Sequence, residues 1–315
     1  MDKLIERESA PRSPLAAAPA LAVQFFLIPL AVVAVTAAVY IGFRSLLADT
    51  RTPQDYLTEI RTGGMARAWP AAFELSRSMD DPRVRSDKAL AVALVQAFDE
   101  AKDGDPRVRK YLALAIGRLE PPLPAQAVNV LLKSLDDPEK HWTPDMFSRF
   151  NGWTDEMSEA HISTIWALGA SGDASVAPKL EPLYASTDPG VRKIVVYSLG
   201  ALPGDAQLPT LQAALQDEAA DVRWNAAVAL ARHGRRDGES VLKQMLDRSY
   251  VEQMVKREAR PNADIDPVAD VMISGLRAAA VLKDDALKPT VITLSQNDAS
   301  MKVREVALEA LKVMG

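Results

Sequence analysis

The 315-residue sequence contains no cysteine and only three histidines. The absence of cysteine excludes disulfides, thiolate metal sites and a cysteine nucleophile, and three histidines leave little for a zinc site or a catalytic triad. The formal net charge is −5, whereas a nucleic-acid-binding domain is usually basic. Motifs of the HExxH, GxSxG and GxGxxG types are also missing. We therefore expect a non-enzymatic protein with no cofactor, no metal and no nucleic-acid partner.

One long apolar run, residues 21–43, follows a charged tail over residues 1–20 and carries no formal charge itself. As a helix it would span about 34 Å, which matches a hydrocarbon core of roughly 30 Å. A cleaved signal peptide is the competing interpretation, but the run exceeds a usual signal-peptide core and no small-x-small cleavage site follows it. The sequence thus predicts a single-pass transmembrane helix that contacts membrane lipid through residues 21–43.

The orientation of this helix is weakly specified by the charges beside it. The basic residues near the run are Lys3, Arg7 and Arg12 before it and Arg44, Arg51 and Arg61 after it. The positive-inside count is therefore tied, but a short tail with six charges is more easily left in the cytoplasm. This favours an extracytoplasmic, periplasmic location for the rest of the chain, with the cytoplasmic face as the alternative.

Residues 44–64 form a predicted membrane-proximal segment with a short helix over Pro53–Arg61. Thr52 is a favoured N-cap residue, and proline is favoured at the first helical position. Gly63 and Gly64 then indicate a turn or hinge.

A motif of the form Asp-Pro-x-Val-Arg, followed by an apolar stripe and a small residue, recurs along the rest of the chain. Its full copies begin at Asp81, Asp105 and Asp188, and its arginine position is occupied by Arg85, Arg109, Arg192, Arg223 and Arg304. Aspartate before proline caps a helix start, and the terminal glycine is expected to form a left-handed C-cap. We expect the arginines to form a structural ladder by reaching the capping aspartate or a carbonyl of the adjoining repeat. The alternative is that they bind an anion.

This motif resembles that of HEAT repeats, especially the short HEAT-like units first associated with phycobilin lyases. The resemblance covers residues 65–315 and implies an all-α fold, a right-handed α-solenoid of helix pairs behind the predicted transmembrane helix, of a kind that usually binds proteins. The layout, with a YLxEIRxGG-like segment at Tyr56–Gly64, also looks like that of membrane-anchored bacterial HEAT proteins. It implies a scaffold or accessory subunit of a membrane complex, such as an ABC-type transporter, with integral membrane subunits as partners. The alternatives are an adaptor that recruits soluble proteins and a chromophore-lyase-like subunit.

The spacing of repeat ends shows two insertions. The spacing is 31 residues from Gly169 to Gly200 and again from Gly200 to Ala231, but 52 from Gly117 to Gly169. The extra residues lie at 137–153 and 248–266. The helices expected to flank them are Pro124–Leu135 and Thr154–Leu168 for the first, and Glu239–Asp247 and Pro267–Leu282 for the second.

The two insertions carry the residues that we predict to contact a partner. These are Trp142, Phe147, Phe150 and Trp153 in the first insertion and Tyr250 and Arg257 in the second. Large aromatic residues often anchor protein interfaces. The alternatives are that the aromatic residues form a private core against the solenoid and that the second insertion is a solvated charged face, with a short helix ended before Pro261.

Overall fold

The computed structural model describes residues 27–47, 51–135, 153–258 and 266–315, without the side chains of residues 43–47, 153–157 and 256–258. The chain divides into two compact units, Met1–Arg51 and Thr52–Gly315.

The first unit contains helix α2 (Ile28–Leu47), and this helix corrects the membrane prediction. Arg44 lies within it. None of the described helices combines the length and the apolar character that a membrane span requires. The predicted single-pass membrane localisation is therefore wrong, and the predicted transmembrane helix and its lipid contact through residues 21–43 are not supported.

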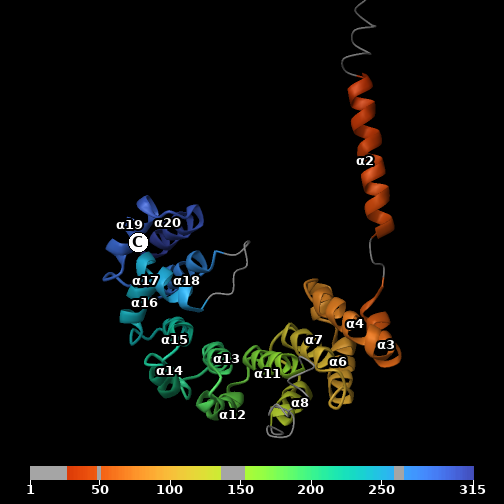
Figure 1. The fold of residues 1–315 in the computed structure, drawn as a ribbon, viewed down its shortest axis with the longest axis horizontal. Helices are drawn as coiled ribbons and strands as arrows, with labels where there is room; N and C mark the ends of the chain where they lie inside the picture. The colour runs from red at the N-terminus through yellow and green to blue at the C-terminus, as the bar shows by residue number, and fades with distance from the viewer. Residues whose placement is uncertain (1–26, 48–50, 136–152, 259–265) are drawn as a thin grey trace, which may run out of the picture. The chain divides into compact units, whose positions relative to one another are not determined.

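The second unit is a succession of helix pairs (Figure 1). Its first helices are α3 (Pro53–Thr62), α6 (Lys88–Glu100), α8 (Ala125–Leu135), α12 (Ala177–Leu180) with its flanking 3-10 turns η3 (Ala174–Val176) and η4 (Glu181–Ala185), α14 (Leu208–Ala214), α16 (Glu239–Met245) and α19 (Lys288–Asn297). Its second helices are α4 (Gly64–Ser78), α7 (Pro106–Gly117), α11 (Trp153–Gly169), α13 (Pro189–Leu199), α15 (Ala220–Arg232), α18 (Pro267–Leu282) and α20 (Met301–Met314). Two additional short helices are α5 (Pro82–Arg85) and α17 (Arg248–Glu258).

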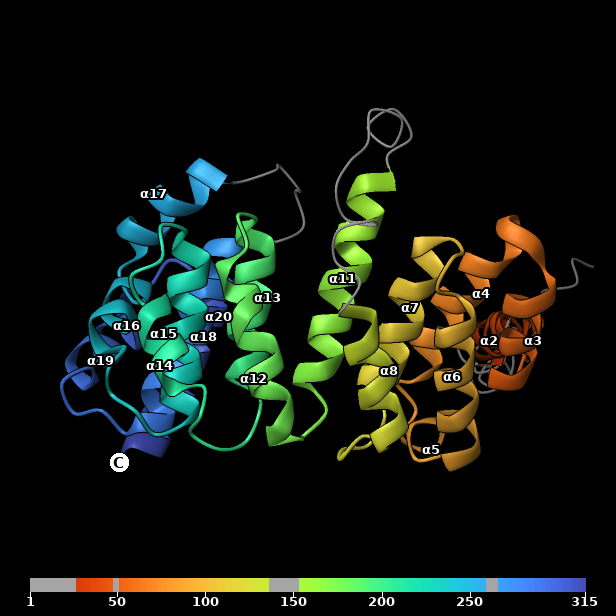
Figure 2. The same cartoon turned by 90° about the horizontal axis from the view of Figure 1, so that it is seen from below.

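The second helices lie side by side in chain order, each in contact with the next from α4 to α20 (Figure 2). Their buried sides carry mostly alanine, valine and leucine, and these form one continuous core with the first helices. This arrangement, in which each pair packs on its neighbours, is that of an α-solenoid. Among the described residues of this unit, no further layer covers one side of the second helices.

The helix starts follow the motif. Asp81, Asp105 and Asp188 each precede a proline, and each carboxylate accepts a hydrogen bond from the backbone N–H two residues later. Thr52 and Asp55 form a capping box at the start of α3. These caps satisfy backbone donors that a helix end leaves unpaired.

The glycines near the ends of the second helices have a different role from the predicted left-handed C-cap. Gly200 has a φ of −71°, and neither Gly117 nor Gly169 has a positive φ. A Cβ atom on Gly200 would lie 2.2 Å from the Cβ of Ala229, and one on Gly169 would lie 2.5 Å from the Cβ of Ser198. These distances are far below van der Waals contact, so glycine is required because adjacent second helices cross closely.

The motif arginines bind carbonyl groups at the end of the preceding first helix. The Nη1 atom of Arg192 donates to the carbonyl oxygens of Ser186 and Thr187 at 3.1 and 3.2 Å. The same contacts recur from Arg223 to Asp217 and Glu218 and from Arg304 to Asp298 and Ala299. Arg109 donates to the carbonyl oxygen of Lys102. Because a helix end leaves carbonyl groups unpaired, the motif arginine closes the turn between the two helices in these four repeats.

Arg192 also joins two repeats. Its Nε and Nη2 atoms donate to the carboxylate of Asp217 in the next repeat at 2.9 and 3.0 Å, and both side chains are almost fully buried. Burial alone would raise the pKa of Asp217, but hydrogen bonds from Arg192, the Ala219 backbone and Tyr184 hold it below its usual value. Burial and the adjacent Asp217 raise the pKa of Tyr184 to about 12. The group therefore remains a charged pair with a neutral phenol at neutral pH.

The N-terminal members of the expected ladder are arranged differently. Asp105 pairs with Arg107 at 2.7 Å, and no contact between Asp105 and Arg109 is seen among the described residues. The Nε atom of Arg85 is buried, and no described residue accepts a hydrogen bond from it. The repeating contact is thus from arginine to carbonyl groups and not from arginine to the capping aspartate of its own motif.

Candidate functional site: a groove across the second helices

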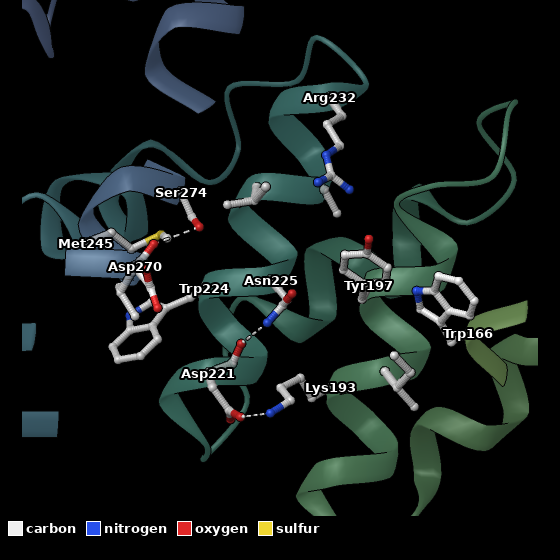
Figure 3. Close-up of a pocket in the computed structure, with 14 residues that line it drawn as sticks. Trp166, Lys193, Tyr197, Asp221, Trp224, Asn225, Arg232, Met245, Asp270 and Ser274 are labelled. Carbon is white, nitrogen blue, oxygen red and sulfur yellow. Dashed lines mark hydrogen bonds and ion pairs between the residues drawn. The ribbon is translucent and has the colours of Figure 1, made fainter. Parts of the chain in front are cut away.

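A groove of about 450 Å³ lies across α11, α13, α15 and α18, on the side of the second helices that no further layer covers (Figure 3). Three aromatic residues line it, Trp166 from α11, Tyr197 from α13 and Trp224 from α15. The aliphatic lining residues are Ile194, Val228, Ala229 and Val271, with Met245 contributed by α16. Such an apolar hollow with a few polar groups is typical of a binding site.

The repeat period places the aromatic residues. Trp166 and Tyr197 each stand three residues before the helix-crossing glycine of their repeat, Gly169 and Gly200, and are 31 residues apart. Equivalent positions in successive repeats face the same side. Tyr197 is 37% exposed, although the valines that precede it at 195 and 196 are completely buried. Helix α13 therefore packs the two valines into the core and directs the ring of Tyr197 to the groove within a single turn.

The charges on one side of the groove form a pair between adjacent repeats. The Nζ atom of Lys193 in α13 lies 3.0 Å from the carboxylate of Asp221 in α15. Lys110 in α7 and Glu159 in α11 occupy the equivalent positions of earlier repeats and form the same kind of pair. These charges largely neutralise each other, which makes this part of the groove suitable for an uncharged segment of a ligand.

Two further charges border the groove. The guanidinium group of Arg232, near the end of α15, lies over the ring of Tyr197 at 5.6 Å from the centroid, a favourable cation–π contact. Asp270 lies in the first turn of α18 and is exposed. Figure 3 shows Trp224 on the side of Asp270, away from Tyr197 and Trp166.

Trp224 has a buried donor. Its side chain is almost fully buried, with 5% of the residue exposed, and its Nε1 atom has no hydrogen-bond partner among the described residues. Buried indole N–H groups usually have a partner. One donor beside the groove is therefore buried without a partner among the described residues.

Aromatic residues also lie on the earlier second helices. Phe73 of α4 and Tyr111 of α7 make an edge-to-face contact with centroids 5.2 Å apart, and Arg107 lies over the ring of Trp69 at 5.0 Å. Phe73 is 36% exposed. The uncovered side of the second helices is thus rich in aromatic residues in a chain where they make up only 6%.

None of the residues that the sequence predicted for partner contact is among the described residues that line the groove. Trp142, Phe147 and Phe150 lie outside the described residues. Trp153 is the first residue of α11 and Arg257 belongs to α17, and the side chains of both are outside the described ones. Tyr250 is partly buried and accepts a hydrogen bond from Arg223 at 3.2 Å, so it contributes to the contact between repeats.

The residues that line the groove were not predicted from the sequence, although it contained a signal for two of them. Trp166 and Tyr197 share a position in the 31-residue period, and Val228 occupies it in the next repeat. A comparison of repeats position by position would have found this apolar column. Trp224 falls at another position, and only the structure shows that it lines the same groove.

Comparison with known proteins supports this architecture. Residues 153–231 and 184–260 match the family model for HEAT repeats. The complex of CpcE and CpcF of phycocyanin lyase from Nostoc sp. PCC7120 has a similar fold, with a TM-score of 0.50 and 17% identity over 84% of this chain and 88% of that chain. Human deoxyhypusine hydroxylase in complex with glycerol aligns with 18% identity over 83% of this chain and 95% of that chain, at a TM-score of 0.34.

No curated protein sequence matches this chain. At this level of identity the likeness to the lyase subunits concerns the fold alone. The match shows HEAT repeats within residues 153–260, and the likeness to the lyase complex shows a shared fold over most of the chain.

Proposed function

We propose that this protein is a non-catalytic scaffold whose second helices hold a segment of a partner protein in the groove between α11 and α18. The observation that carries this proposal is the pair of rings at equivalent positions, Trp166 and Tyr197, which line the groove outside the continuous core. The proposal includes no membrane anchor, because the structure contradicts one in the described parts of the chain.

The packing of the helices supports a binding role for these rings. The core is already complete around them, since Val195, Val196, Ile165 and Leu168 on the same two helices are fully buried. The ring of Tyr197 therefore adds little to the contact between repeats, whereas that of Trp166 both lines the groove and packs beside Gly117 of the preceding repeat. Large aromatic residues in a desolvated hollow commonly dominate the free energy of binding at protein interfaces.

The experiment compares co-purification of partners by the full chain and by two variants in the source cells. The groove variant carries Trp166→Ala and Tyr197→Ala. The control variant carries Ile292→Ala and Leu308→Ala, two exposed apolar residues of α19 and α20 that are absent from the groove. We expect the groove variant to lose a partner that the control retains, and the purified partner to bind the groove variant at least tenfold more weakly.

Circular dichroism and thermal unfolding check that both variants remain folded. Partners recovered equally by all three chains would contradict the proposal. A purified chain that turns over a substrate, with activity lost on changing one polar residue, would contradict its non-catalytic part.

A further inference from the structure

The polar side chains inside the groove leave little for a ligand to pair with. Lys193 pairs with Asp221, and Asn225 donates to the Asp221 carbonyl at 2.7 Å. The Nε1 atom of Trp224 is buried, with almost no accessible surface through which a ligand could reach it. A ligand in the groove therefore meets the apolar lining and the charges at its border.

The two remaining charged side chains, Arg232 and Asp270, indicate how a ligand is oriented in the groove. Neither Arg232 nor Asp270 has an ion-pair partner among the residues that the structure describes. They lie on different helices, with opposite charges, and the apolar lining is placed around Tyr197 and Trp224 (Figure 3). A complementary ligand has a negative group near Arg232, an apolar group in the hollow and a positive group near Asp270.

Resting on the proposed function, we propose that the groove binds an extended peptide segment of the partner in which an acidic residue, a large aliphatic residue and a basic residue follow one another. The aliphatic side chain enters the hollow between Tyr197 and Trp224. The acidic and basic side chains pair with Arg232 and Asp270.

The charge pattern favours a polypeptide over a lipid surface or a free anion. The groove has two positive and two negative side chains, Lys193, Arg232, Asp221 and Asp270. An anionic headgroup or phosphate would meet carboxylates as well as cations, and carboxylates repel it. A polypeptide supplies acceptors along its backbone and charges of both signs from its side chains.

The test measures the anisotropy of fluorescein-labelled ten-residue peptides titrated with the full chain. Each peptide has two central leucines in a glycine–serine background. The probes carry glutamate before and lysine after the leucines, or the reverse order, and the matched controls replace the leucines by serines or the lysine by glutamate. We expect one order to bind, the serine control to bind at least tenfold more weakly, and the lysine-to-glutamate control to lose most of its binding.

Two protein variants identify the contacts. Asp270→Lys should weaken binding of the preferred peptide and restore binding of the lysine-to-glutamate control, whereas Asp285→Lys, an exposed carboxylate outside the groove, should change neither.

The outcomes separate this inference from the proposed function. Equal binding of all peptides, binding of none, or no rescue by Asp270→Lys would overturn the inference. If Trp166→Ala with Tyr197→Ala still abolishes co-purification of the partner, the scaffold role stands and only the peptide pattern fails. If that variant retains every partner, the scaffold role fails as well.

Discussion

Replacement of Gly200 by alanine tests the close crossing of α13 and α15. The new Cβ would lie 2.2 Å from the Cβ of Ala229 and 2.9 Å from its Cα. Contact between carbon atoms is favourable near 3.5–4.0 Å, so the two helices must separate by about 1.5 Å or distort locally. We therefore expect the variant to be less stable than the natural chain.

The magnitude follows from two opposed effects. Overpacking of a close contact typically costs about 1–3 kcal/mol, and the large overlap places Gly200→Ala at the upper end of this range. Removal of a glycine reduces the entropy of the unfolded chain and contributes about 0.4–1 kcal/mol in the other direction. The net expectation is a decrease in the free energy of unfolding by about 2 kcal/mol.

Gly104→Ala is the matched control. Its nearest atom to the new Cβ is the carbonyl oxygen of Ala101 at 3.5 Å, which is ordinary contact, and its φ is not positive. This variant should be unchanged or slightly more stable because only the entropic effect remains.

Urea denaturation gives the change in stability, and native-state hydrogen exchange gives its location. In a linear array the damage should be concentrated in adjacent repeats, so amides of α13 and α15 should exchange faster while those of α4 and α7 change little. Equal unfolding midpoints for Gly200→Ala and Gly104→Ala, or uniform acceleration of exchange, would refute the reasoning.

Two other predictions concern buried titratable groups. Asp217→Asn should cost about 2–4 kcal/mol because it leaves the buried Arg192 partly unpaired, whereas Glu218→Gln, whose side chain is 84% exposed, should change the unfolding midpoint by less than about 0.5 kcal/mol; equal effects would contradict the model of the pair. Burial lowers the pKa of His161 from 6.5 to about 4. The unfolded chain binds this proton at a higher pH than the folded chain does. The free energy of unfolding should therefore keep its full value above about pH 6.5 and fall by up to about 3 kcal/mol as the pH decreases to 4. Denaturation curves between pH 7 and pH 4 should show this loss, and His161→Gln should reduce it; an unchanged dependence on pH would show that other groups cause it.

The sequence predicted the helix pairs because their signals are local. The aspartate caps at Asp81, Asp105 and Asp188 depend on residues two positions apart, and the start of α18 at Pro267 follows from the same chemistry. The glycines were misinterpreted because their constraint is not local. A left-handed cap and a close helix crossing both favour glycine, and only the distance from Gly200 to Ala229 distinguishes them.

The candidate site was less predictable because it combines residues from several repeats. Aromatic density drew attention to Trp142 and Phe147, which lie outside the described residues, whereas Trp166 was not singled out. The groove depends on the side-by-side placement of four helices, and the missing partner of Trp224 becomes visible only when its described neighbours are placed. The apolar run at residues 21–43 misled because its composition alone was taken to indicate a membrane span.

The spacing between the groove rings and the crossing glycines has a consequence for how such a chain can change. In α13 the residue that lines the groove, Tyr197, stands less than one helical turn from Gly200, which sets the distance to the neighbouring helix. The two positions point to different surroundings, so a substitution at 197 can alter the groove while the contact between repeats stays intact. Substitutions at positions 197 and 228 can therefore change the lining of the groove one repeat at a time, without changing the array that carries it.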